Sequence, residues 1–233
     1  MQNLSKKGKK TKKKSKEEVA EEETSEESTE EIEQEEEAAP QQMSLMDLLG
    51  GGQGADTPEA RSIMFVGEVT EERAADLISA LLVLSQTKAP EAERAEPIKL
   101  YVSTYGGSAD EMFGIYDVVN YCKKFCDIET IGLGKVMSAG TLMLASGTKG
   151  KRKLGKHCRV MIHAVNGGQV GDIHNLQNEL EQTVSLQDSY IQALSHETNM
   201  TKRQIQTLIN RKVNVYLTAE EAIEKGLADE ILE

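Results

Sequence analysis

The 233-residue sequence lacks several features that would indicate particular classes of protein. It has only three cysteines, an odd number that suits a reducing compartment better than a disulfide framework. No stretch approaches the ~18 apolar residues of a membrane span, and the first residues lack the apolar core of a secretory signal peptide. No Gly-x-x-x-x-Gly-Lys-Ser/Thr run is present, so we expect no ATP site in the chain. These absences predict a cytoplasmic protein without a membrane partner.

Charge is distributed unevenly along the chain. Residues 1–57 contain eight lysines, fifteen acidic residues and no aromatic residue. Such a segment cannot bury enough apolar surface to offset the entropy of folding, so we expect a disordered, charged tail. Its basic run, Lys6 to Lys16, would suit nucleic acid. However, an acidic run, Glu17 to Glu37, follows at once and the whole chain has a net charge of −12, so no nucleic-acid partner is expected.

A short apolar island at 43–49 lies inside this tail, and five residues that include four glycines follow it. The island could be a docking peptide or one frayed helical turn, and the glycines would form a flexible joint. The remaining residues, 58–233, are of a length that suits one domain.

Strand-like and helix-like segments alternate through residues 58–233. Apolar periodicity predicts strands at 62–66, 98–102, 129–133, 159–163 and 213–217, and helices at 71–85, 108–125, 137–146 and 172–198. Capping boxes mark three helix starts, at Ser108/Glu111, Thr201/Gln204 and Thr218/Glu221. Repeated β-α-β units imply a mainly parallel sheet with right-handed crossovers, and the fold class is α/β.

The predicted helix at 172–198 is unusual because most of its residues are polar. Its apolar residues form only a narrow stripe, which is too little to pack against a single sheet. Such a helix either projects to meet another subunit or lies on the surface in contact with solvent.

Three features together point to acyl transfer. Ser138 lies where a predicted strand passes into a helix of small residues, whose amides could face a developing negative charge. Gly106 and Gly107 lie at a second strand-to-helix turn, where a backbone amide could serve an oxyanion hole. His163 ends a third strand. Each has a simpler explanation alone: an N-cap serine, a tight turn and a core histidine. The combination at strand ends favours a catalytic site.

The cysteines, together with His157, could be the ligands of a metal site. Cys122 and Cys126 are one helical turn apart, and His157 and Cys158 follow later. A simpler interpretation is that Cys122 is a small core residue on a helix. We therefore expect neither a metal nor another cofactor.

Four segments resemble those of the ClpP family of serine peptidases, which has the ClpP/crotonase type of fold. They are Ser103-Thr-Tyr-Gly-Gly-Ser108, Met137-Ser-Ala-Gly140 with its continuation to Arg152, Arg159-Val-Met-Ile-His163 with Gly167-Gly168, and Ala219-Glu-Glu-Ala222 with Lys225-Gly-Leu-Ala-Asp229. The 25-residue step from Ser138 to His163 is also the family's spacing. The resemblance covers about Ser62 to Leu232.

The resemblance implies a role for each matching residue. Ser138 would be the nucleophile and His163 the general base of an endopeptidase that acts on unfolded proteins or peptides. The amides of Gly107 and Ala139 would hold the oxyanion. Substrate would bind as an added strand along Gly106 and the segment from Asn166 through Gly167 and Gly168 to Gln169. The long helix would be the handle by which two heptameric rings stack into a chamber, built from this chain or from paralogous subunits.

The sequence departs from the family at the third catalytic residue. The alignment places Asn214 where the family has its catalytic aspartate, and Asn210 at the family's other aspartate. No acidic residue lies between Met200 and Ala219. Asparagine can accept the histidine hydrogen but cannot offset imidazolium charge. The alternatives are a working but weakened peptidase, a site that borrows a carboxylate from elsewhere, and a catalytically inactive ring subunit.

Other departures concern partners and substrate. The family's axial loops, which meet an ATP-driven unfoldase, have no recognisable counterpart before Arg61, so such a partner is a doubtful expectation. Tyr105 replaces the proline of the glycine turn, and Ala164-Val165 replaces Gln-Pro, which indicates altered substrate contacts. An acyl-CoA enzyme of the crotonase fold would instead need an acidic base near the glycines. Asp110 and Glu111 lie there, but helix capping explains them more simply.

Overall fold

A computed structural model describes residues 60–168 and 170–232. The predicted tail at 1–57, the island at 43–49 and Gln169 lie outside these residues. The described strands are β1 (Ser62–Val66), β2 (Ile98–Thr104), β3 (Ile128–Met137), β4 (Lys153–Gly155), β5 (Arg159–Ile162), β6 (Val215–Leu217) and β7 (Glu230–Leu232). The helices are α2 (Glu71–Gln86), α3 (Ala109–Cys122), α4 (Ala139–Ala145), α5 (Ile173–Glu197), α6 (Lys202–Ile209) and α7 (Ala219–Glu224).

The described strands form one mixed sheet. Its main path is β1-β2-β3-β4-β7, all parallel, and β5 pairs with β3 on a branch that ends in the antiparallel β6. The predicted α/β class with a mainly parallel sheet is therefore confirmed. Strands β4 and β7 were not expected from the sequence, because three residues are too few to establish a period.

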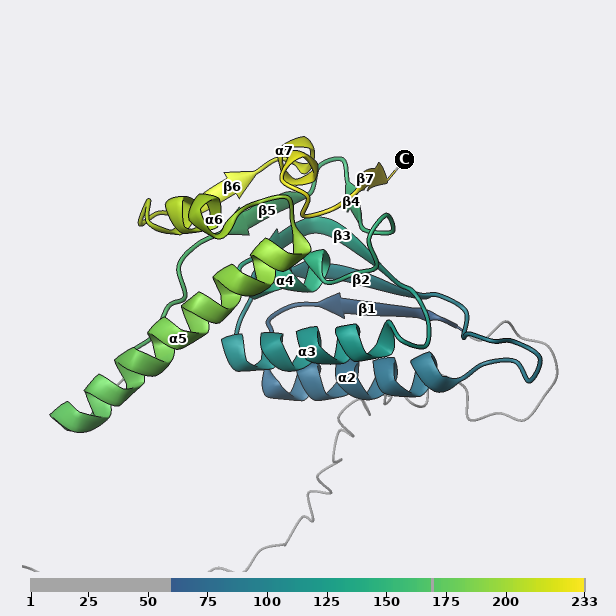
Figure 1. The fold of residues 1–233 in the computed structure, drawn as a ribbon, viewed down its shortest axis with the longest axis horizontal. Coiled ribbons are helices and arrows are strands. Elements are labelled where there is room, and N and C mark those ends of the chain that lie inside the picture. The colour runs from purple at the N-terminus through teal and green to yellow at the C-terminus, as the bar shows by residue number, and fades with distance from the viewer. Residues whose placement is uncertain (1–59, 169, 233) are drawn as a thin grey trace, which may run out of the picture. The chain divides into compact units, whose positions relative to one another are not determined.

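Helices α2 and α3 run side by side along the sheet (Figure 1). The apolar spacing of α2 buries Ala74, Leu77, Leu81 and Leu84 in the core, and its first turn is capped by the hydroxyl of Thr70. Helix α4 packs against β2, β3, α3 and α5, and every residue of α4 is buried. Small side chains make this central position possible: a Cβ at Gly140 would lie 2.3 Å from a methyl carbon of Thr104.

The capping predictions differ in outcome. Reciprocal capping boxes form at Thr201/Gln204 and at Thr218/Glu221. At the start of α3, the structure records the bond from the Glu111 amide to the Ser108 hydroxyl.

Strand β3 is longer than the sequence predicted, and its extension positions the site. The predicted strand ended at 133, but β3 continues to Met137. A register shift in its pairing with β2, together with Gly134 at φ +66°, bends the strand midway. Its residues Ile131 and Gly132 pair with β4, and its last three residues pair with β5. The bend therefore delivers Ser138 beside the end of β5.

Helix α5 extends away from the domain, which is one of the two arrangements that its composition allowed (green in Figure 1). Only residues near its C-terminal end are buried. Toward its start, Ile173 is 71% exposed, Leu180 65% and Val184 51%. Among the described residues, no helix combines the length and apolar character needed to cross a membrane.

Candidate active site

Ser138 occupies the junction between β3 and α4 in a strained conformation. Its φ of 54° and ψ of −120° lie outside the regions that residues with a Cβ normally adopt. Strain of this kind costs about 1–3 kcal/mol and is concentrated at functional sites. The Ser138 side chain makes no capping bond to α4. Ser138 is therefore not the ordinary N-cap serine that the sequence alone could not exclude.

Hydrogen bonds hold the Ser138 backbone in place. Its amide donates to the carbonyl of Met161 on β5 at 2.9 Å, and the Thr141 hydroxyl donates to the same carbonyl at 3.0 Å. The Ser138 carbonyl accepts from the Thr141 amide at 2.9 Å and from the Tyr190 hydroxyl at 3.3 Å. The contacts with Met161 and Tyr190 come from two other elements, β5 and α5, so tertiary structure maintains the strained junction.

His163 directly follows β5, and its ring reaches the serine. Its Nε2 lies 2.7 Å from Ser138 Oγ. Burial lowers the pKa of His163 below its ordinary value of 6.5, so the ring is neutral at pH 7. A neutral ring that accepts the serine hydrogen at Nε2 carries its own hydrogen on Nδ1. The pair has the arrangement of a nucleophile and its general base.

Gly106 and Gly107 lie against Ser138 and have no room for a side chain. A Cβ at Gly106 would lie 2.6 Å from the Cβ of Ser138, and one at Gly107 would lie 2.3 Å from the carbonyl oxygen of Val69. Val69 donates to the Gly106 carbonyl and accepts from the Ser108 amide, both at 2.9 Å. In this parallel bridge the Gly107 amide points away from Val69. It is positioned as a donor to a ligand.

A cavity of about 580 Å³ opens beside these residues. Its lining includes both glycines, Ser138, Ala139 and His163, so most predicted site residues border one space. The family departures noted in the sequence also border it: Tyr105, Ala164 and Val165. Asp110 and Glu111 are not among the described lining residues, so this cavity gives no support to the crotonase-type alternative.

The predicted substrate segment follows His163 toward α5. Asn166, Gly167 and Gly168 are exposed, and Asn166 lines the cavity. A Cβ at Gly167 would lie 2.8 Å from the hydroxyl oxygen of Thr183 on α5. The cavity wall on this side therefore ends at Asn166, and the chain then runs close to α5.

Asn214 lies on the far side of His163 from the serine. Strands β5 and β6 pair Val160 with Leu217 and Ile162 with Val215, and the next pair in this register is His163 with Asn214. A second cavity of about 360 Å³ is lined by His163, Asn214 and Asn210. The Asn214 side chain is exposed, and no hydrogen bond between it and His163 is recorded for the described residues. No Asp or Glu is among the described residues that line this second cavity.

The cysteines lie away from this site. Cys122, Cys126 and Cys158 are buried free thiols, and burial raises the pKa of each of them. Within the described part of the chain, no three His, Cys, Asp or Glu side chains are grouped as a metal site would require. The thiols pack as core residues.

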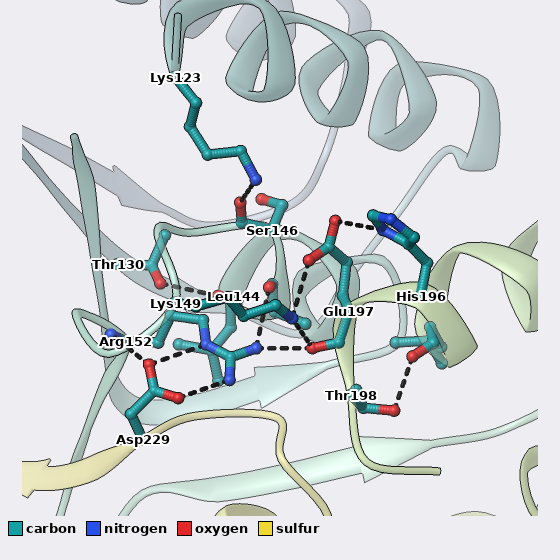
Figure 2. A network of polar contacts seen from close by, with 12 residues as sticks. Lys123, Thr130, Leu144, Ser146, Lys149, Arg152, His196, Glu197, Thr198 and Asp229 are labelled. Atoms are coloured by element: carbon teal, nitrogen blue, oxygen red, sulfur yellow. Dashed lines mark hydrogen bonds and ion pairs between the residues drawn. The ribbon is translucent and has the colours of Figure 1, made fainter. Parts of the chain in front are cut away.

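A buried ionic network secures the other end of α4 (Figure 2). The Arg152 guanidinium bonds both oxygens of Asp229, at 3.0 and 2.6 Å, and its Nη1 donates to the carbonyls of Ala145 and Glu197 at 3.2 and 2.7 Å. Lys123 donates to the carbonyl of Ser146 at 2.8 Å. Cations at a helix C-terminus stabilise its dipole, so the network fixes the helix that carries Ser138 at its start.

The carboxylates in this network are held ionised. Burial alone would raise the pKa of Asp229, but hydrogen bonds from Arg152 outweigh it and the pKa is lowered. Burial likewise opposes ionisation of Glu197, yet Lys149, 2.9 Å from its carboxylate, and Lys123 bring its pKa below the usual range.

Sequence reasoning missed two parts of the site. The sequence indicated Tyr190 only as part of the apolar stripe, although its hydroxyl reaches Ser138. Arg152 and Asp229 belong to the family-like segments, but their bidentate pairing over 77 residues of chain was not expected. A buried tyrosine requires a hydrogen-bond partner, which is the one signal that could have indicated Tyr190.

Comparison with known proteins agrees with this geometry. The model of the family described as Clp protease matches residues 56–233. The chain is also 33% identical, over 171 residues, to the ATP-dependent Clp protease proteolytic subunit 2 of Thermobifida fusca (strain YX). That match covers 73% of this chain and 80% of the relative.

Proposed function

The chain belongs to the Clp protease family, and we propose that this Clp-type serine peptidase cleaves peptide bonds with Ser138 as nucleophile and His163 as general base. The observation that carries the proposal is the 2.7 Å contact between His163 Nε2 and Ser138 Oγ, at a strained serine that borders a large cavity.

The proposed mechanism begins as His163 Nε2 accepts the hydroxyl proton while Ser138 Oγ attacks the scissile carbonyl carbon. The resulting oxyanion lies between the amides of Gly107 and Ala139. Ala139 is the first residue of α4, so its amide has no acceptor within the helix. His163 then gives the proton to the departing amine, which leaves an acyl-enzyme. Water, deprotonated by the same histidine, hydrolyses this ester and regenerates Ser138.

We propose that substrate enters as an extended chain. It would lie in the cavity between the glycine turn and the segment Asn166–Gly168, with Gln169 as its predicted continuation. Backbone pairing to either wall would hold it in an extended form, which suits unfolded proteins and peptides. Tyr105, which is 70% exposed, borders the same cavity and would contact side chains of the substrate.

Asn214 would act as the third catalytic residue, although an amide can do less than a carboxylate at this position. Its amide oxygen can accept the Nδ1 hydrogen of His163 and orient the ring. It cannot balance the positive charge that His163 gains during attack. In trypsin, replacing the triad aspartate by asparagine lowers turnover ~10⁴-fold. We therefore propose a working but slow site.

The assembly is also a proposal. The exposed apolar residues along α5 would meet those of another subunit, and two heptameric rings would stack through these helices into a closed chamber. Paralogous subunits could take part in the same rings. Any ATP dependence would come from a separate unfoldase, because the sequence contains no Gly-x-x-x-x-Gly-Lys-Ser/Thr run.

One experiment tests this proposal against its alternative, an inactive ring subunit, which the asparagine at position 214 favours. The purified chain, Ser138→Ala and Asn214→Asp are incubated with a fluorophosphonate probe. We expect slow labelling of the parent, none of Ser138→Ala and faster labelling of Asn214→Asp. Labelling of Asn214→Asp alone would identify a silenced subunit. Equal labelling of Ser138→Ala and the parent would remove Ser138 as nucleophile.

A further inference from the structure

Helix α5 contacts the catalytic junction through Tyr190. This side chain is 4% exposed, and it lines the cavity beside Ser138. Its hydroxyl donates to the Ser138 carbonyl at 3.3 Å, at the long end of the hydrogen-bonding range. The contact joins a helix that extends from the domain to the backbone of the nucleophile.

The carbonyl that Tyr190 contacts belongs to the same peptide unit as the amide of Ala139. A trans peptide is planar, so its C=O and N–H point in opposite directions. Tyr190 therefore acts together with the Thr141 amide, which donates to the same oxygen at 2.9 Å, to fix the direction of the Ala139 N–H. It also polarises that N–H and makes it a stronger donor. Both effects act on an amide that would hold the oxyanion.

Helix α5 is tied to α4 a second time, at the opposite end. Arg152 Nη1 bridges the carbonyl of Glu197, the last residue of α5, and that of Ala145, the last residue of α4. The step from Tyr190 to Glu197 and the step from Ser138 to Ala145 are both seven residues, which span about 10 Å at the helical rise of ~1.5 Å per residue. The two ties are therefore matched in spacing, and α5 holds α4 at both ends.

We propose that Tyr190 is a positioning residue that sets the oxyanion-binding direction of the Ser138–Ala139 peptide and couples it to α5. This inference rests on the proposed peptidase function. It predicts that the Tyr190 hydroxyl stabilises the transition state and contributes little to substrate binding. Its removal would therefore lower kcat and leave KM nearly unchanged.

The test compares Tyr190→Phe with Tyr116→Phe in the full chain. Tyr116 is a matched control because its hydroxyl donates to the Glu197 carboxylate at 3.0 Å, whereas the tie between α5 and α4 uses the Glu197 carbonyl, and Tyr116 is not among the described residues that line the cavity. Turnover of a fluorogenic peptide is measured for both variants. We expect kcat to fall about tenfold in Tyr190→Phe, less than the 10²–10³-fold cost of deleting a whole oxyanion donor, with KM within about twofold. Tyr116→Phe should keep the parent kcat.

A second readout separates positioning from stability. A peptide aldehyde adds the Ser138 hydroxyl across its carbonyl and places the new oxygen at the oxyanion position, whereas the matching peptide alcohol cannot. Tyr190→Phe should weaken binding of the aldehyde by the same factor by which it lowers kcat. Binding of the alcohol should stay unchanged. Equal kcat in Tyr190→Phe and Tyr116→Phe would refute the positioning role. So would equally weakened binding of the aldehyde and the alcohol. In either case the Tyr190 hydroxyl would be a buried group that merely satisfies its hydrogen bond.

Different results would refute the role of Tyr190 and the peptidase function on which it rests. A parent chain that turns over peptide, together with unchanged kinetics in Tyr190→Phe, overturns only the role of Tyr190. A parent and an Asn214→Asp variant that neither turn over peptide nor react with fluorophosphonate overturn the peptidase function and the inference together.

Discussion

His163, directly after β5, and Asn214, directly before β6, are the next opposed residues in the antiparallel register of these strands. Opposed residues in such a pair carry their side chains on one face of the sheet, and both residues border the same second cavity. This shared position is the basis for the proposal that Asn214 orients the ring. Its amide in place of a carboxylate has a direct consequence for the pH dependence.

The acid limb of the pH–rate profile should lie below pH 6.5. Catalysis requires neutral His163, and burial lowers the pKa of its ring below 6.5, so kcat/KM should fall to half of its plateau value at a pH below 6.5. In Asn214→Asp, a nearby negative charge favours imidazolium, so the limb should move to higher pH while the plateau rises. Rates of peptide hydrolysis across about pH 5–8, at constant ionic strength, measure the position of the acid limb and the height of the plateau for the parent and the variant. An unshifted limb in Asn214→Asp would show that position 214 does not sense the ring.

The glycine turn should tolerate no side chain. In Gly106→Ala, the new Cβ would lie 2.6 Å from Ser138 Cβ, and φ of +104° is unfavourable for alanine. We expect peptide hydrolysis to fall at least about 100-fold, with a loss of about 1–3 kcal/mol in the free energy of unfolding. Gly150→Ala is the matched control, because its φ of +81° is equally unfavourable but no atom lies within 4 Å of its added Cβ. Comparable activity in the two variants would refute the close approach to Ser138.

The Arg152–Asp229 pair should support stability and depend on pH in a defined direction. Arg152→Met removes the guanidinium that pairs with Asp229. Breaking a buried ion pair in this way lowers the free energy of unfolding by about 3–5 kcal/mol. Burial raises and Arg152 lowers the pKa of Asp229, with a net decrease from the ordinary 3.8. The stabilisation from this carboxylate is therefore present above about pH 4 and lost as pH falls through the lower, folded value.

Denaturant unfolding at pH 7 and pH 3 measures this effect. Asp229→Asn removes the titrating group, so its free energy of unfolding should change less between the two values than that of the parent. Lys153→Met is the control, because Lys153 pairs with Glu230 at 2.6 Å with a half-exposed carboxylate, and such a pair contributes about 0–1 kcal/mol. A pH dependence in Asp229→Asn equal to that of the parent would contradict the assignment.

The exposed stripe of α5 should govern assembly. Leu180→Glu places a charge on a residue that is 65% exposed in the single chain and would be buried between stacked subunits. We expect the variant to sediment as smaller particles than the parent, with an unchanged melting temperature of the domain. Gln182→Glu adds a similar charge two residues away and off the apolar stripe, and should behave like the parent. Identical sedimentation of all three proteins would exclude this face as the interface.

The sequence by itself determined the main strands and helices and the set of candidate site residues. Apolar spacing placed the main strands and helices, because burial of one face imposes a period that can be read directly. The small residues around Ser138, the paired glycines and the 25-residue step to His163 were visible as a set, and the polar composition of 172–198 indicated a helix that either projects or lies on the surface. The substitution of asparagine at 214 was also readable without coordinates.

The tertiary structure decided how these parts meet. The bend in β3 that extends the strand to Met137 and places Ser138 against β5 depends on pairing with two different neighbours, which no local pattern encodes. The positive φ of Ser138 persists because β5 and α5 hold its backbone, so strain there could not follow from propensity. The opposition of Asn214 to His163 and the bond from Tyr190 to Ser138 join residues about 50 positions apart. Such contacts arise only when the sheet and α5 have packed around α4.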